Sequence, residues 1–212
     1  MPESAYHPRI VQMKISLLGI EPLIWRRIQV PDDMSLERLH DIIQVAMGWK
    51  DGHLHAFHIG DRRYGIPDQD FSDPDFKIFQ EKNVKISGVI AKGFERFKYE
   101  YDFGDGWEHE VLVEEFPEFD PRLTYPRYVD GARRCPPEDV GGIGGYFDFL
   151  DAITNPSHPD HDEMRDWYGG DFKPDELDID LGCPNRALAV DRFLDRIPWN
   201  RRSRVYAAAS SG

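Results

Sequence analysis

The amino-acid sequence predicts an α+β domain built on a mixed or antiparallel sheet, with helices grouped on one side and at the C-terminus. Two runs near the N-terminus alternate apolar and polar residues, and they lead directly into one amphipathic helix. Two further alternating runs and a long hairpin follow before more helical patterns appear. This order of strand, strand, helix, strand and strand differs from the regular strand–helix alternation that is typical of a parallel sheet.

The helices and strands are predicted, in chain order, from the spacing of apolar residues and from the capping and turn residues that bound each segment. Alternation predicts strands near residues 10–18, 23–30, 53–59, 62–66, 95–103 and 107–115. Between the second and third of these strands, a helix is expected over 35–47, with Ser35 as its N-cap and Gly48 at its end. Its apolar face is expected to carry Leu36, Leu39, Ile43 and Met47.

Other segments carry weaker signals. Residues 67–80 are polar and contain proline, so a loop is expected, and residues 81–92 fit a short helix or a strand. Residues 117–145 are rich in proline and glycine and are expected to be irregular. Short helices are expected from about Tyr146 and Pro159, and a last one after Asn185.

The clearest hairpin lies at 94–116, and its register is inferred from its apolar face. A three-residue loop at 104–106 would place Phe103 opposite Trp107 and Tyr101 opposite His109, which leaves one face apolar except for the imidazole.

The other face of this hairpin would gather like charges. They are Glu100, Asp102, Glu108 and Glu110. Because carboxylates directly across a ladder repel each other, a counter-charge is expected. We expect Arg133 or Arg134 to supply it, and a divalent cation is the alternative.

The composition indicates a single domain over 1–200 and a flexible tail at 201–212. The chain has 212 residues, a net charge of −13, two cysteines and no apolar run long enough for a membrane span. We therefore expect a soluble, cytoplasmic, acidic protein with no membrane contact and with reduced cysteines.

The charge is unevenly distributed, and this bears on partners. Residues 138–180 hold 13 acidic and 2 basic residues, whereas 181–212 hold 2 acidic and 6 basic residues. Binding to a duplex normally needs a basic patch, so direct contact with nucleic acid is not expected. A protein partner or a small ligand suits an acidic surface better.

Two groups of residues carry the chemistry that a site would need. The candidate ligand-binding residues, where carboxylates and an indole flank glycine-rich turns, are Trp49, Asp102, Asp105, Glu138 and Asp139. The candidate metal ligands are His53, His55 and His109, because three converging imidazoles can hold a divalent metal. We nevertheless expect each histidine to be hydrogen-bonded within the core and no cofactor to be needed, with a divalent metal as the alternative.

Long stretches of the sequence resemble the plasmid pRiA4b ORF-3-like family. The resemblance rests on YDFGDGWEH and CPPEDVGG, together with IWRRIQVPDDMSLERLHDIIQVAMGWKDGHLHAFHIG and HPDHDEMRDWYGGDFKPDE, and spans about residues 6–190. It implies a protein of uncharacterised biochemistry, with some members labelled as resolvase-like passengers of insertion elements. Recombinase chemistry is not carried over, because Ser16 lies in a predicted strand and Ser35 looks like a helix cap.

Three functions compete on these grounds. The leading hypothesis is a non-catalytic protein- or ligand-binding module associated with plasmids or mobile elements. The alternative is a metal-dependent, hydrolase-like enzyme with a His/Asp cluster. The second alternative is an accessory protein in DNA transactions, and whether the chain is an enzyme stays open.

Overall fold

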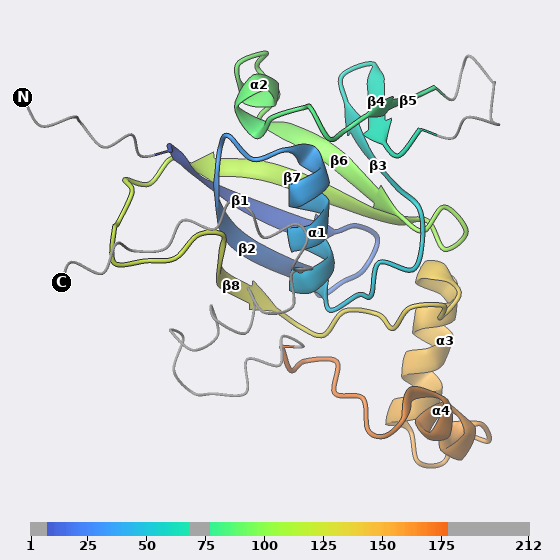
Figure 1. Cartoon of the computed structure of the whole chain (residues 1–212). Helices are drawn as coiled ribbons and strands as arrows, with labels where there is room; N and C mark the ends of the chain where they lie inside the picture. Colours follow the sequence, from blue (N-terminus) through green and yellow to red (C-terminus); the bar gives the residue numbers. More distant parts are fainter. Residues whose placement is uncertain (1–7, 68–76, 178–212) are drawn as a thin grey trace, which may run out of the picture.

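A computed structural model describes residues 8–67 and 77–177, and its strands form one eight-stranded sheet (Figure 1). The strands are β1 (Ile10–Leu17), β2 (Ile24–Pro31), β3 (His55–Ile59), β4 (Arg62–Gly65), β5 (Ile78–Gln80), β6 (Arg96–Tyr101), β7 (Trp107–Glu115) and β8 (Arg127–Ala132). Their order across the sheet is β5-β4-β3-β6-β7-β1-β2-β8. Only β4 and β5 pair in parallel, so the sheet is mixed and mostly antiparallel.

Four helices complete the described fold. They are α1 (Leu36–Met47), α2 (Ile86–Ile90), α3 (Gly142–Thr154) and α4 (His161–Tyr168). Figure 1 shows α1 lying across the sheet, whereas α3 and α4 lie beyond it; α3 begins next to the loop that joins β6 to β7, and α4 packs at the other end of α3. The predicted α+β class is confirmed.

Helix α1 begins and ends where the sequence predicts. The Ser35 hydroxyl accepts a hydrogen bond from the amide of Arg38, and Gly48 closes the helix in the left-handed conformation with φ of 87°. Leu36, Leu39 and Ile43 are completely buried. The predicted apolar face is therefore the one that packs on the sheet.

The hairpin of β6 and β7 differs from the prediction by two residues. Tyr101 pairs with Trp107 and Tyr99 pairs with His109, so the loop spans five residues, 102–106. A shift of two leaves the paired residues of β6 and β7 on their predicted faces. Phe103, predicted on the apolar face, and Asp102, predicted on the outer face, instead lie in the loop, where Phe103 is exposed and Asp102 is buried. The loop is longer because Asp102 leaves the strand with a positive φ of 56°.

The acidic side chains on the outer face of this hairpin are neutralised by its own bases and by β3. Glu108 pairs with Lys98 at 2.6 Å, Glu110 pairs with Arg96, and Glu100 pairs with His58 at 2.8 Å. The expectation that Arg133 or Arg134 does this is wrong.

Both arginines have other partners. Arg133 pairs with Asp175 at 3.1 Å, and Arg134 donates to the hydroxyl of Tyr168 at 3.0 Å. The diagonal pairs within the sheet form instead because they need no long-range contact.

Two short strands were not predicted from the sequence, since β5 lies in the expected loop and β8 lies in the segment expected to be irregular. In segment 81–92, where a short helix and a strand were both open, the structure has the helix α2. The predicted helix after Asn185 and the tail at 201–212 lie outside the described residues. No helix in the described ranges is both long and apolar enough to cross a membrane.

The burial of α1 predicts a large cost for truncating its central leucine. Leu39 is completely buried. We expect Leu39→Ala to lower the free energy of unfolding by about 2–5 kcal/mol, since it removes apolar contacts and leaves a cavity. Urea denaturation measures this change. A change below about 1 kcal/mol would contradict the assigned packing of α1.

Candidate functional site

Three loops meet at one end of the sheet. They are residues 48–54 between α1 and β3, residues 102–106 between β6 and β7, and residues 133–141 before α3 (Figure 1). The two most distinctive sequence motifs, YDFGDGWEH and CPPEDVGG, contribute the second and third loops. We call this place the loop junction.

Asp102 organises the second loop. Its Oδ1 accepts hydrogen bonds from the amides of Gly104 at 3.0 Å and Asp105 at 3.3 Å. Aspartate tolerates the left-handed conformation better than most residues, and these bonds hold the turn. The other carboxylate oxygen, Oδ2, lies 3.5 Å from Nδ1 of His53.

The third loop is tied to the second through Asp105. Its carboxylate accepts a hydrogen bond from the amide of Gly141 at 3.2 Å. Gly142 has a positive φ of 67°, and a Cβ atom there would lie 2.6 Å from the carbonyl oxygen of Asp105. Only glycine allows this approach, which explains the glycine-rich sequence at the start of α3.

Glu138 links the third loop to the first. Its Oε1 accepts hydrogen bonds from the Tyr101 hydroxyl at 2.6 Å and from the Lys50 amide at 3.1 Å. Burial, reinforced by the neighbouring carboxylate of Glu138, raises the pKa of Tyr101. The hydroxyl therefore stays protonated and donates. Trp49 stacks on Tyr101, with 4.9 Å between ring centroids.

A completely buried arginine fixes the start of the third loop. Arg26 donates to the carbonyls of Ala46 at 2.8 Å and Ala132 at 2.9 Å, and its Nη2 lies 3.1 Å from Sγ of Cys135. The guanidinium thus joins the C-terminal end of α1, where carbonyls carry partial negative charge, to β8 and the loop. Trp49 adds a bond from Nε1 to the carbonyl of Pro136 at 3.0 Å.

The chemical centre of the loop junction is an imidazole between two carboxylates. His53 Nδ1 faces Asp102, and its Nε2 lies 3.1 Å from Oδ1 of Asp139. One ligand atom from each residue lies within 4.8 Å of the others. The His53 side chain is 31% exposed and that of Asp139 is 72% exposed, so solvent and ligands reach the group.

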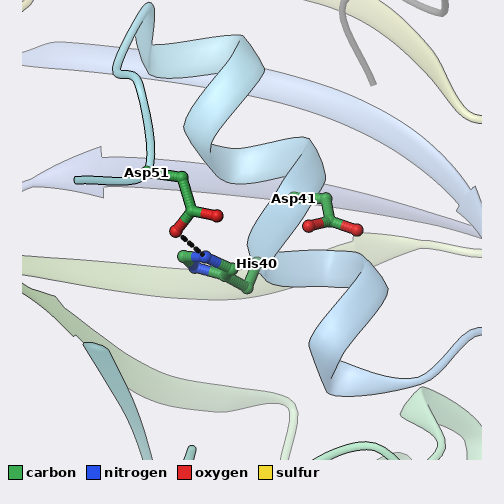
Figure 2. A group of neighbouring side chains, drawn as sticks. All are labelled: His40, Asp41 and Asp51. Atoms are coloured by element: carbon green, nitrogen blue, oxygen red, sulfur yellow. Dashed lines mark hydrogen bonds and ion pairs between the residues drawn. The ribbon is translucent and has the colours of Figure 1, made fainter. Parts of the chain in front are cut away.

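A second His/Asp group, His40 with Asp41 and Asp51, lies on and after α1 (Figure 2). Both ring nitrogens of His40 have partners, because Nδ1 lies 2.8 Å from the Tyr99 hydroxyl and Nε2 lies 2.8 Å from Asp51. Asp41 pairs with Arg38 at 3.4 Å.

Hydrogen bonding determines the protonation of His40. The Tyr99 hydroxyl accepts from Gln44 and donates its one hydrogen to Nδ1, so Nε2 carries the proton and donates to Asp51. Burial also lowers the pKa of His40, which favours this neutral form. A cation would have to break these bonds, so we interpret this group as structural.

His55 belongs to the same buried network. Its ring stacks on His40 with centroids 3.5 Å apart, and its Nε2 lies 3.0 Å from Glu81. Two stacked imidazoles with one carboxylate each form a hydrogen-bonded core layer between α1 and β3.

His109 is buried elsewhere, against Trp49 and Tyr99. Its Nδ1 bonds to the carbonyl of Tyr99 at 3.2 Å, whereas its Nε2 has no hydrogen-bond partner in the part of the chain that the structure describes. Complete burial lowers its pKa to about 4.

The structure therefore brings together most of the predicted site, but not its metal ligands as predicted. Trp49, Asp102, Asp105, Glu138 and Asp139 all lie at the loop junction, as does His53. Within the described ranges, the groups able to hold a metal do not join His53 with His55 and His109. The sequence prediction started this strand two residues too early. Strand β3 begins at His55, so His53 lies in the preceding loop.

Several residues of this region were missed from the sequence. Tyr101 was assigned only to an apolar face, and His40 and Glu81 were not considered. Near α3, Asp148 and Trp167 line a pocket that also reaches Asp139. The acidic excess over residues 138–180 was the signal that pointed to it.

The comparisons with known proteins agree with the motifs. The model of the plasmid pRiA4b ORF-3-like protein family matches residues 9–181. An uncharacterized protein, y4hQ, of Sinorhizobium fredii is 40% identical over 199 residues, which cover 92% of this chain and 96% of the relative. The crystal structure of protein MM3350 of unknown function from Methanosarcina mazei Go1 superimposes with a TM-score of 0.73 at 32% identity. It covers 82% of this chain and 97% of that one.

The buried neutral His109 predicts a loss of stability in acid. Its pKa is about 4 in the folded state and about 6.5 when unfolded, so protons bind preferentially to the unfolded chain between these values. The contribution of neutral His109 to the free energy of unfolding is fully present above pH 6.5. It is lost as the pH falls toward 4, and the total loss is about 3 kcal/mol. Urea denaturation across this range should show a shallower decline for His109→Phe than for the unmodified chain. Parallel declines would contradict the assignment.

Proposed function

This chain belongs to the plasmid pRiA4b ORF-3-like family, and we propose that it is a binding protein whose loop junction holds a divalent cation through His53, Asp102 and Asp139. We further propose that it works in the cytoplasm, in association with the plasmids or mobile elements that the family description suggests. A protein partner or small ligand would complete the coordination from the open side.

One observation carries the proposal: one ligand atom from each of His53, Asp102 and Asp139, which come from three different loops, lies within 4.8 Å of the other two. The backbone amides that bind Oδ1 of Asp102 hold that carboxylate in place, as outer hydrogen bonds do in metal sites. An imidazole with two carboxylates suits zinc or manganese better than calcium or magnesium, which prefer oxygen ligands alone.

The surroundings support a binding role. Two exposed apolar residues lie beside Asp102. Phe103 follows it in the chain and is 44% exposed, and Leu54, which is 56% exposed, accepts a hydrogen bond from the Asp102 amide through its carbonyl. Exposed apolar side chains beside an accessible charged group are typical of contact surfaces. The surrounding acids favour a cation and disfavour phosphates.

Calorimetric titration of zinc and manganese into chelator-treated protein tests the proposal. We expect one equivalent to bind and His53→Ala to weaken binding at least tenfold. Because a ligand that binds only the folded state stabilises it, metal at about 100 times its Kd should add about 2.7 kcal/mol.

His58→Ala is the matched control, since the His58 side chain is similarly exposed but faces only one carboxylate, Glu100, on the neighbouring strand. It should bind metal as the unmodified chain does. Absence of binding in the unmodified chain, or equal affinity in the His53 and His58 variants, would refute the proposal.

A further inference from the structure

A pocket of about 530 Å³ lies between α3, α4 and the third loop. This volume falls within the usual range for ligand pockets. Four aspartates line it, namely Asp139, Asp148, Asp151 and Asp160, and Trp167, Phe149 and Met164 provide apolar surface. We call it the acidic pocket.

The negative charge of the acidic pocket is poorly compensated. Among residues 8–67 and 77–177, its lining contains no lysine or arginine, and the one histidine there, His158, lies 3.8 Å from Asp151 and 3.9 Å from Asp160. The nearby Arg165 is engaged with Asp171 at 2.7 Å. This differs from the outer face of the sheet, where the acids have basic partners.

The two helices explain how an aromatic wall faces these acids. Asp148 and Asp151 are three residues apart on α3, so they share a face, and Met164 and Trp167 share one on α4. A hydrogen bond of 3.0 Å, which His161 Nδ1 donates to the carbonyl of Ala152, holds the start of α4 against α3.

Trp167 keeps a large exposed surface in this arrangement. It is 48% exposed, although its ring contacts Phe149 edge to face with centroids 5.7 Å apart. An indole that remains open beside several carboxylates offers a cation both ring-face and ionic contacts.

We propose that the acidic pocket receives an arginine side chain from a basic peptide segment of a protein partner. A guanidinium is planar, stacks on an indole and donates paired hydrogen bonds to carboxylates, whereas an ammonium does only part of this. This proposal is separate from the cation site. Asp139 is common to both, but Asp148, Asp151 and Trp167 belong to the pocket alone.

Fluorescence anisotropy of a labelled peptide of alternating glycine and arginine tests the proposal on the full chain, with EDTA present. The double variant Asp148→Asn, Asp151→Asn should bind at least tenfold more weakly. Trp167→Ala should also weaken binding, and Trp167→Phe should largely restore it. The corresponding lysine peptide should bind more weakly than the arginine peptide.

The double variant Asp61→Asn, Glu95→Gln is the matched control for net charge, since it also removes two carboxylates and both are exposed, one in the turn between β3 and β4 and one just before β6. It should change the affinity less than twofold, and circular dichroism melts should show that all variants fold. Equal weakening by the control and pocket variants would mean nonspecific attraction and would overturn the proposal. So would tighter binding of spermidine or of the lysine peptide.

His53→Ala separates this proposal from the cation site. We expect it to leave peptide affinity unchanged, whether or not the loop junction binds metal. Loss of peptide binding in His53→Ala, with binding retained in the double variant, would place the peptide at the loop junction and overturn the pocket.

Discussion

The arrangement of the loop junction depends on one buried guanidinium. Arg26 is completely buried and bonds to the end of α1, to β8 and to the sulfur of Cys135. A buried charge is tolerated only when its donors are satisfied, so these groups must keep their relative positions. The loop that leaves Cys135 therefore starts from a fixed point, three residues before Glu138.

From that point, each successive contact positions the next. Trp49 holds Pro136, Glu138 binds the Tyr101 hydroxyl, and Asp105 binds the amide of Gly141. Asp139 lies between the last two contacts, which explains how an exposed residue comes to face His53. The same contacts set where α3 begins, so the acidic pocket and the loop junction share one support.

The sequence predicted the regular elements well because their signals are local. Period and capping placed α1, and alternation placed β1 and β2. The predicted register of the hairpin of β6 and β7 was wrong by two residues. The Asp102 side chain bonds to amides of its own loop and lengthens that loop, and the alternation of residues cannot reveal this. The loop junction was anticipated from chemical density, but the partners of His53 were not. The distance between His53 and Asp139 depends on Arg26, on Trp49 and on the contact of Gly142 with Asp105. These come together only in the folded chain.

The net charge of −13 conceals two different electrostatic regimes. On the outer face of the sheet, Glu108 and Glu110 alternate with bases on the neighbouring strand, so attraction within the ladder satisfies them. Around α3 the chain supplies few bases, and Asp148 and Asp151 stand on one helical face. Exposed pairs contribute little to stability, so the first regime mainly prevents repulsion. The second regime produces a negative electrostatic potential around α3 and the loop junction, which attracts positively charged groups.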